Sequence, residues 1–265
     1  MTHTRTVPPL DAVFAPNLLQ DRVAVVTGGG SGFGLEITRL MLRYGARVAI
    51  ASRQGDRLER AAEDLRRGVG RAPLPVVCDV REPQAVQAMA DRVTAEYGAP
   101  DIVVNNAAGN FRMPAERMTL RAFQTVVDID LIGTFNVTKA FVGAMLERGS
   151  GSIVNIVVPA PSRGFPWFSH AGAAKAGVES LTASWAREWG PRGVRVNAVA
   201  PGLVRTDGVQ ANMLPGGEAE PDHPPLARNG TATDVANAVV FLASDASAWV
   251  TGTTVTVDGG DSTRS

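Results

Sequence analysis

The chain has 265 residues, of which 45% are hydrophobic, so it can bury one continuous core and is expected to form one α/β domain. Its 26 basic residues balance 26 acidic residues, and this zero net charge provides no overall field favouring nucleic acid or an anionic membrane as a partner. The single cysteine excludes an internal disulfide, and the three histidines lack ligand spacing, so no metal site is expected.

Short runs rich in Val, Ile and Ala alternate with longer segments of helical length, after an N-terminal arm at residues 1–18. The domain at residues 19–265 is predicted to contain strands at 22–27, 47–51, 74–79, 102–106, 152–157, 194–200 and 253–257. The helical segments include 35–43, 84–96, 120–147 and 171–189. This alternation predicts a single-domain Rossmann fold, a doubly wound, seven-stranded parallel sheet flanked by helices. Ligands bind beyond the carboxyl ends of such strands.

A glycine-rich loop, TGGGSGFG at residues 27–34, follows the first strand and opens the first helix. Its glycines let the backbone approach a phosphate, and the helix N-terminus supplies free N–H groups and a positive dipole. The flanking strand and helix make a chance glycine turn a poor explanation. We therefore expect a dinucleotide to be bound by Gly28, Gly30, Ser31, Gly32, Phe33 and Gly34.

The second strand is followed by Ser52 and Arg53 instead of an acidic residue. Sites that prefer NAD place a carboxylate there to hold the ribose hydroxyls. Arg53, together with Arg57, can instead pair with a 2′-phosphate. The alternative is a solvated arginine at a helix start. The sequence therefore favours NADPH over NADH.

Polar residues also end the third and fourth strands. Asp79, followed by Val80, could accept a hydrogen bond from an adenine amino group. Asn105 and Asn106, followed by Ala107, either contact the cofactor or tie strand ends together through side-chain to backbone bonds. The sequence leaves these two roles open.

Several ordered motifs resemble those of the short-chain dehydrogenase/reductase superfamily, from about residue 19 to residue 260. They are the glycine-rich loop, NNAAG at residues 105–109, Val196-Asn197 with Pro201-Gly202, and DGG at residues 258–260. The resemblance implies that Pro201, Gly202 and Val204 contact the cofactor. It also implies a mobile substrate lid at about residues 203–229, whose composition alone indicates only a long loop.

The catalytic positions depart from that family. Its lysine lies four residues after a catalytic tyrosine, which a serine precedes by thirteen residues. Lys175 matches the lysine, but Ala171 occupies the tyrosine position and Val158 the serine position. Tyr44 and Tyr97 are expected at the opposite edge of the sheet. Because ketone reduction needs an acid that protonates the oxygen, the vacancies argue against an ordinary carbonyl reductase.

Two polar residues lie near these vacancies. Asp130 replaces the family's active-site asparagine, and its charge would hold Lys175, which could bind the nicotinamide ribose and orient a water. A harmless structural replacement is the alternative. His170 precedes Ala171, but one helical residue rotates a side chain by about 100°, which favours capping or packing over the role of a substitute acid.

Residues 107–111, 128–137 and 170–175 further resemble the peroxisomal-type 2,4-dienoyl-CoA reductases, which also lack the tyrosine and serine. This resemblance implies NADPH-dependent reduction of a dienoyl-CoA thioester to an enoyl-CoA, with Asp130 and Lys175 as catalytic residues. It also implies that Arg81, Phe111 and Arg121 contact the acyl-CoA, although a solvated surface role is the alternative for each arginine. An arginine expected near residues 210–212 is replaced, so CoA recognition could differ.

Two other functions remain open. A general carbonyl or 3-oxoacyl reductase is disfavoured by the missing tyrosine, and a non-catalytic NADP-binding sensor is disfavoured by the retained Lys175. The composition favours a cytoplasmic location, supported by the lack of a recognisable peroxisomal tripeptide at the carboxyl end. The family resemblance suggests a homotetramer that uses the long helices and the final strand.

Overall fold

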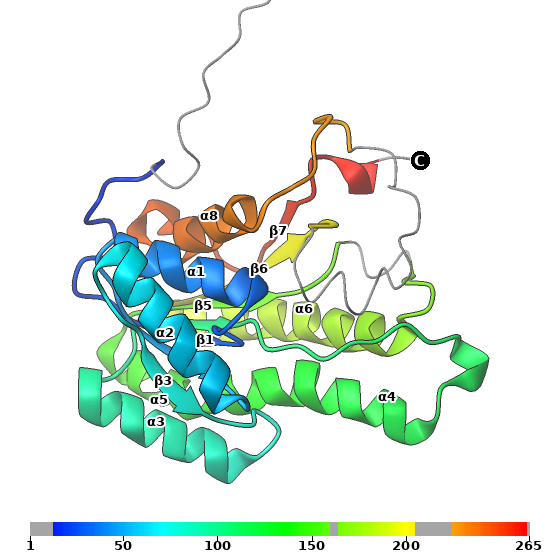
Figure 1. Cartoon of the computed structure of the whole chain (residues 1–265), viewed down its shortest axis with the longest axis horizontal. Coiled ribbons are helices and arrows are strands. Elements are labelled where there is room, and N and C mark those ends of the chain that lie inside the picture. The colour runs from blue at the N-terminus through cyan, green and yellow to red at the C-terminus, as the bar shows by residue number, and fades with distance from the viewer. Residues whose placement is uncertain (1–12, 160–163, 205–223, 264–265) are drawn as a thin grey trace, which may run out of the picture.

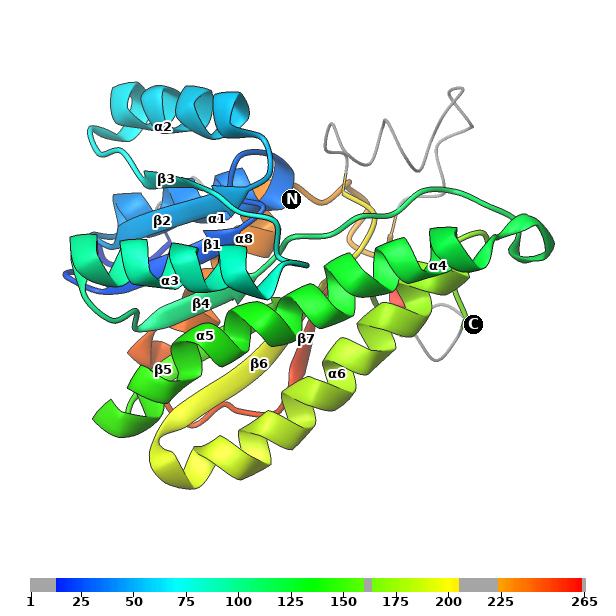
Figure 2. The ribbon, with the colours of Figure 1, turned by 90° about the horizontal axis from the view of Figure 1, so that it is seen from below.

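Seven parallel strands form a single sheet at the centre of the fold (Figure 1), in the order β3-β2-β1-β4-β5-β6-β7 (Figure 2). The structure is a computed structural model that describes residues 13–159, 164–204 and 224–263. The strands are β1 Val23–Thr27, β2 Arg47–Ser52, β3 Leu74–Val77, β4 Ile102–Asn105, β5 Gly151–Ile156, β6 Val194–Pro201 and β7 Thr254–Val257. The order reverses between β1 and β4, and ligands bind at such a switch point. The predicted fold class and all seven strands are confirmed.

Helices cover both faces of the sheet (Figure 2). One face carries α1 Gly32–Arg43, α2 Gly55–Val69 and α8 Ala232–Ala243. The other carries α3 Pro83–Tyr97, α4 Leu120–Val127, α5 Gly133–Arg148 and α6 Ser169–Trp189. The strand β1 shows why both helix layers are needed, because its apolar side chains alternate between the two faces of the sheet. Ala24 and Val26 pack on the α1 and α8 side, and Val23 and Val25 pack on the opposite side.

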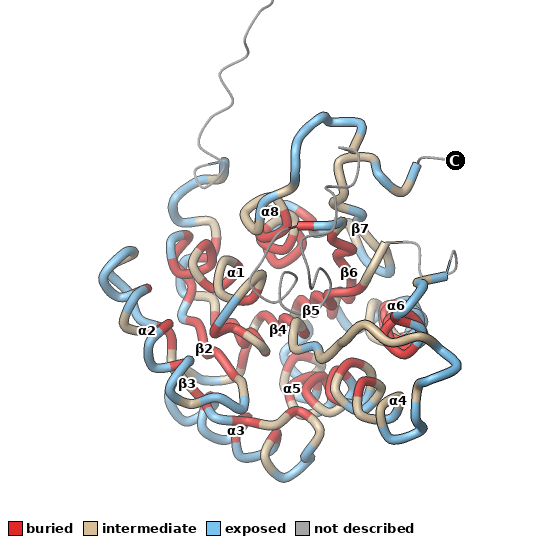
Figure 3. The backbone as a smooth tube through the Cα atoms, turned by 45° about the vertical axis from the view of Figure 1, so that its right-hand side comes forward, coloured by how far each residue is buried: buried red, intermediate tan, exposed pale blue. Residues whose placement is uncertain are grey.

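The buried residues follow this layering, with the strands and the inward sides of the helices at the centre (Figure 3). The α1 side includes Ile37, Leu40 and Val239, and the α3 side includes Met89 and Phe141. Strands buried on both sides leave only their ends available for polar chemistry. The fold therefore concentrates candidate functional residues at the carboxyl edge of the sheet.

The helix predicted at residues 120–147 is interrupted. A π-helical turn, Asp128–Ile132, separates α4 from α5 and buries Asp130 completely. The start of α5 packs closely on the segment that follows β3, since a Cβ at Gly133 would lie 2.5 Å from Cγ2 of Val80. The whole stretch Leu120–Arg148 is long and apolar enough to cross a membrane by composition, a test that core helices also pass, and α5 packs on β4 and β5.

The predicted N-terminal arm and the predicted substrate lid are only partly described. Residues 1–12 of the predicted arm and residues 205–223 of the predicted lid lie outside the described residues. The described ends of the lid segment meet, because Val204 forms an isolated parallel bridge with Gly230. Val204 and Gly230 therefore lie side by side, just beyond β6.

Candidate active site at the carboxyl edge of the sheet

The glycine-rich loop folds tightly between β1 and α1. Gly28 has a φ of +68°, and a Cβ at Gly34 would stand 2.3 Å from the carbonyl oxygen of Gly28. Ser31 precedes α1 but makes no side-chain cap bond, and the first turn contains no acidic residue. The first backbone N–H groups of α1 therefore point to the loop without a side-chain cap, as an anion site requires.

Thr27 and Asn106 join the ends of β1 and β4. Thr27 Oγ1 accepts the N–H groups of Asn106 and Ala107, each at 3.0 Å, and Nδ2 of Asn106 donates to the carbonyl oxygen of Thr27 at 2.9 Å. Asn105 is buried and donates to Thr138 Oγ1 and to Asn155 Oδ1. Asn106 thus makes the predicted side-chain to backbone bond between strand ends, whereas Asn105 bonds to side chains of α5 and β5. A contact of either asparagine with the cofactor stays a prediction.

A groove of about 270 Å³ runs across the strand ends. It brings together the following predicted cofactor residues: Gly28, Gly30, Ser31, Arg53, Arg57, Asp79, Val80, Asn106 and Ala107. The other predicted cofactor residues are not part of its lining: Gly32, Phe33, Gly34, Lys175, Pro201, Gly202 and Val204. The side chain of Phe33 packs on the α1 and α8 core. The groove leads from the glycine loop to the two arginines.

Arg53 and Arg57 stand beside the N-terminus of α2, where an adjoining hollow of about 300 Å³ is bordered by Gln54, Arg57 and Arg60. Both arginines are exposed, and within the described part of the chain neither makes an ion pair. Asp56 also lines this hollow, in the first turn of α2. Basic side chains such as Arg53 and Arg57, next to a helix N-terminus, can pair with a phosphate group.

Asp79 and Arg81 form a local ion pair at the end of β3. Arg81 Nε donates to both carboxylate oxygens of Asp79, at 3.0 and 3.1 Å. The hydrogen bond from Arg81 holds the pKa of Asp79 below its ordinary value, and the nearby Arg53 adds to this effect. Arg81, predicted to contact acyl-CoA, is therefore already neutralised by Asp79. Arg121 is exposed on α4 and lines neither groove nor hollow.

Lys175 and Asp130 form a buried ion pair. Lys175 Nζ lies 3.4 Å from Oδ2 of Asp130 and donates to the carbonyl oxygen of Ile156 at 2.9 Å. Oδ1 of Asp130 accepts the N–H of Gly109 at 2.8 Å. The predicted proximity of the two residues is confirmed. The bonds to Gly109 and Ile156 were not predicted from the sequence.

The vacant tyrosine position is filled by apolar packing. Ala171 is 1% exposed and packs with Val126 and Phe168, while Phe111 and Phe165 cover this cluster. Val158 follows β5 and is half-buried. Tyr44 ends α1, and Tyr97 ends α3 beside Arg47 at the start of β2, so both lie at the amino edge as expected.

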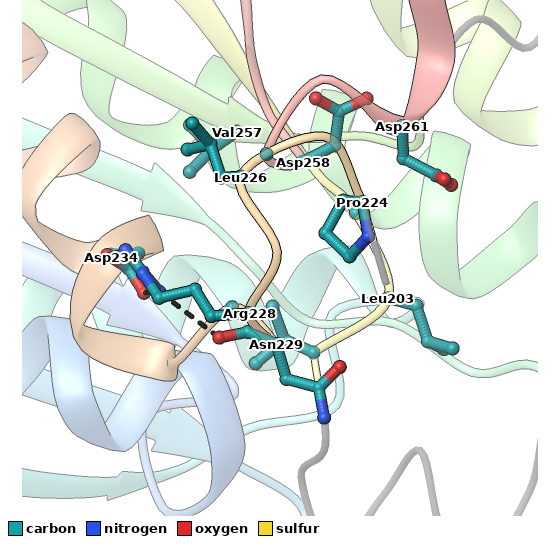
Figure 4. Close-up of a pocket in the computed structure, with 13 residues that line it drawn as sticks. Leu203, Pro224, Leu226, Arg228, Asn229, Asp234, Val257, Asp258 and Asp261 are labelled. Atoms are coloured by element: carbon teal, nitrogen blue, oxygen red, sulfur yellow. Dashed lines mark hydrogen bonds and ion pairs between the residues drawn. The ribbon is translucent and has the colours of Figure 1, made fainter. Parts of the chain in front are cut away.

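A second hollow of about 190 Å³ lies beyond β6 and β7 (Figure 4). Gly202 and Val204 border it, and a Cβ at Gly202 would lie 2.6 Å from Cβ of Asp258. The carboxylate of Asp258 accepts the N–H groups of Gly260 and Ser262, which closes the turn after β7. This structural role of the DGG motif was missed from sequence, although an acidic residue before two glycines is a typical turn signal.

The chain is similar to known proteins over nearly its entire length. A family model described as enoyl-(acyl carrier protein) reductase matches residues 28–262. The peroxisomal 2,4-dienoyl-CoA reductase [(3E)-enoyl-CoA-producing] of Danio rerio is 44% identical over 253 residues, covering 94% of this chain and 84% of that protein. Its counterpart from Rattus norvegicus is 43% identical, with 94% and 86% covered.

Solved structures show the same similarity. A levodione reductase structure has a TM-score of 0.88 and 32% sequence identity, and the match covers 93% of this chain and 100% of that chain. A citronellol catabolism dehydrogenase of Pseudomonas aeruginosa PAO1 has a TM-score of 0.83 and 35% identity, with 95% and 99% covered.

Proposed function

This chain is an oxidoreductase of the short-chain dehydrogenase/reductase family, and from that premise we propose that it reduces 2,4-dienoyl-CoA thioesters to 3-enoyl-CoA with NADPH. The observation that carries the proposal is the buried pair of Lys175 and Asp130 beside Ala171. Lys175 provides a cation that is fixed in place, and Ala171 provides no acid at the tyrosine position. Relatives at 43–44% identity bear the name of this activity.

The fit to NADPH rests on the groove and on the exposed arginines. Arg53 and Arg57 would hold the 2′-phosphate, while the N-terminus of α1 would hold the pyrophosphate. Asp79 lies within the groove, where the adenine is expected. When bound, NADPH supplies the hydride. Lys175, anchored by Asp130 and Ile156, would bind the nicotinamide ribose and hold a water near the reacting carbons.

The chemistry explains why Ala171 is tolerated. Hydride arrives at the δ carbon of the conjugated thioester, and the electron pair moves through the diene onto the thioester oxygen as a dienolate. Protonation of the α carbon then leaves a double bond between the β and γ carbons, which is the 3-enoyl product. The oxygen needs hydrogen-bond donors but never a full proton, so a tyrosine acid is dispensable.

The decisive assay follows NADPH consumption by the purified chain with dienoyl-CoA substrates of several lengths. We expect turnover with at least one length and a 3-enoyl product by mass spectrometry and NMR. Acetoacetyl-CoA is the matched comparison, because a carbonyl reductase would reduce it at a useful rate. Tight NADPH binding without turnover of any dienoyl-CoA would contradict the proposal and support the sensor function.

We propose in addition a homotetramer in the cytoplasm. Ile132 and Phe135, near the start of α5, are 42% and 44% exposed, and Trp249, shortly before β7, is fully exposed. Apolar side chains on two separate elements suit two subunit interfaces. The single cysteine suits a reducing compartment, whereas the named relatives are peroxisomal. Light scattering tests the mass, and imaging of tagged protein tests the location.

A further inference from the structure

His170 is a fully buried polar side chain with one ring nitrogen that no described residue satisfies. The residue lies in the first turn of α6 and is 0% exposed. Its Nδ1 accepts the N–H of Ala171 at 2.9 Å, which leaves the ring hydrogen on Nε2. Nε2 has no hydrogen-bond partner in the described part of the chain. Because a buried, unsatisfied donor destabilises a fold, such a group calls for a functional explanation.

The surroundings of His170 are aromatic. The ring of Phe111 packs edge-to-face on it with centroids 4.6 Å apart, and Phe168 lies at 6.4 Å. A contact between an N–H group and an aromatic face is a weak, second-order interaction and does not replace a hydrogen bond to oxygen. Of the two aromatic neighbours, Phe111 is half-buried, so its side chain can turn outward and uncover Nε2.

His170 also adjoins the vacant tyrosine position. Ala171, at the vacant tyrosine position, follows it directly, and Lys175 comes about one helical turn later. Phe111 lies two residues after Gly109, which binds Asp130. The Nζ of Lys175 donates to Ile156 and faces Asp130, and under the proposed function its other N–H groups serve the nicotinamide ribose and a water. The thioester oxygen therefore calls for another donor.

We propose that His170 recognises the carbonyl oxygen of the substrate thioester, to which Nε2–H donates a hydrogen bond once Phe111 has turned aside. The inference rests on the proposed function only in taking an acyl-CoA as the ligand. The bond strengthens as negative charge develops on the oxygen during hydride transfer. His170 keeps its proton throughout, and the α carbon receives its proton from the water that Lys175 would hold.

Two substitutions separate this role from packing. His170→Asn keeps an acceptor near the position of Nδ1 for the N–H of Ala171 but removes the distal donor. His170→Gln places an amide N–H near the position of Nε2. The paired ligands are an acyl-CoA thioester and the S-alkyl-CoA thioether of equal length, which lacks the carbonyl oxygen. Affinities are measured by calorimetry with NADP⁺ present.

We expect H170N to weaken thioester binding by about 3- to 10-fold, the worth of one neutral hydrogen bond, and to leave thioether binding unchanged. H170Q should bind the thioester within about twofold of the wild type. With a dienoyl-CoA, kcat of H170N should fall by about 100-fold, because the lost donor serves the developing oxyanion. Unchanged NADPH affinity in both variants reports an intact fold.

Equal losses for thioester and thioether would show that His170 only packs, and no loss for either ligand would show that it does not touch the substrate. Either result overturns the inference. The inference also fails if the wild type binds neither the thioester nor the thioether. A carbonyl-dependent loss in H170N, combined with no turnover by the wild type, would refute the proposed activity and support the role of His170.

Discussion

Lys175 Nζ and Asp130 Oδ2 lie 3.4 Å apart in the interior, where the two side chains are 7% and 0% exposed. Lys175 comes from α6, and Asp130 comes from the π-helical turn between α4 and α5. Each residue has a further anchor, the carbonyl oxygen of Ile156 for Lys175 and the N–H of Gly109 for Asp130. The pair is therefore held from both sides beside a position without a tyrosine.

Removing Lys175 should stop catalysis and also destabilise the fold. Lys175→Met leaves Asp130 charged, buried and unpaired, which should lower the free energy of unfolding by about 3–5 kcal/mol. The double variant K175M/D130N should recover most of that stability without recovering turnover. Urea denaturation and NADPH consumption measure the two effects. Equal stability of the single and double variants would show that the two charges do not interact.

Arg53 and Arg57 should set the preference for NADPH. Because a charge-assisted bond to phosphate contributes about 1.5–3 kcal/mol, Arg53→Ala should weaken NADPH binding by about 10- to 100-fold and leave NADH binding nearly unchanged. Arg57→Ala should act in the same direction. Arg67→Ala, at the far end of α2, is the matched control. Fluorescence titration gives the affinities, and a parallel loss for both cofactors would argue against a 2′-phosphate contact.

The glycine loop should reject even a methyl group at Gly34. A Cβ there would meet the carbonyl oxygen of Gly28 at 2.3 Å and Nδ2 of Asn106 at 2.6 Å, so Gly34→Ala should abolish cofactor binding and destabilise by about 1–3 kcal/mol. Gly68→Ala on α2 is the control, because its Cβ would meet nothing within 4 Å. It should stabilise by about 0.5–1 kcal/mol. Thermal melts with and without NADPH distinguish the two variants.

At the start of α8, the side chains of Thr231 and Asp234 each accept the backbone N–H of the other, which forms a capping box. This capping box should make the free energy of unfolding depend on pH in the acid range. The side-chain hydrogen bond from Arg228, aided by Thr231, lowers the pKa of Asp234 from 3.8 to about 2. The unfolded chain therefore binds the proton first, and the contribution of Asp234 is complete above about pH 4 and lost as the pH falls towards 2.

Asp234→Asn tests this dependence. At neutral pH it should lower the free energy of unfolding by about 1 kcal/mol, the usual contribution of a helix cap. The difference between variant and wild type should shrink as the pH falls from 4 to 2. Chemical denaturation across that range measures it, and a constant difference would assign the effect to packing.

Local sequence patterns were sufficient to predict the strands and the glycine loop, and to locate the vacancies at Ala171 and Val158. A strand buried on both faces requires a run of apolar residues, and a loop around a phosphate requires glycines, so both leave marks in adjacent residues. The helix α8 was not among the predicted segments, although Thr231 and Asp234 form a recognisable capping pair.

Tertiary structure decided the roles of the polar side chains. The sequence located Asp130, Lys175, Arg81 and His170, but it could not show that Arg81 is neutralised by Asp79 or that Nε2 of His170 is enclosed without an acceptor. These outcomes depend on side-chain rotamers and on contacts between distant segments, such as the π-helical turn that carries Asp130 towards α6. Burial also sets the strength of a charge or a donor, and burial is a property of the packed chain.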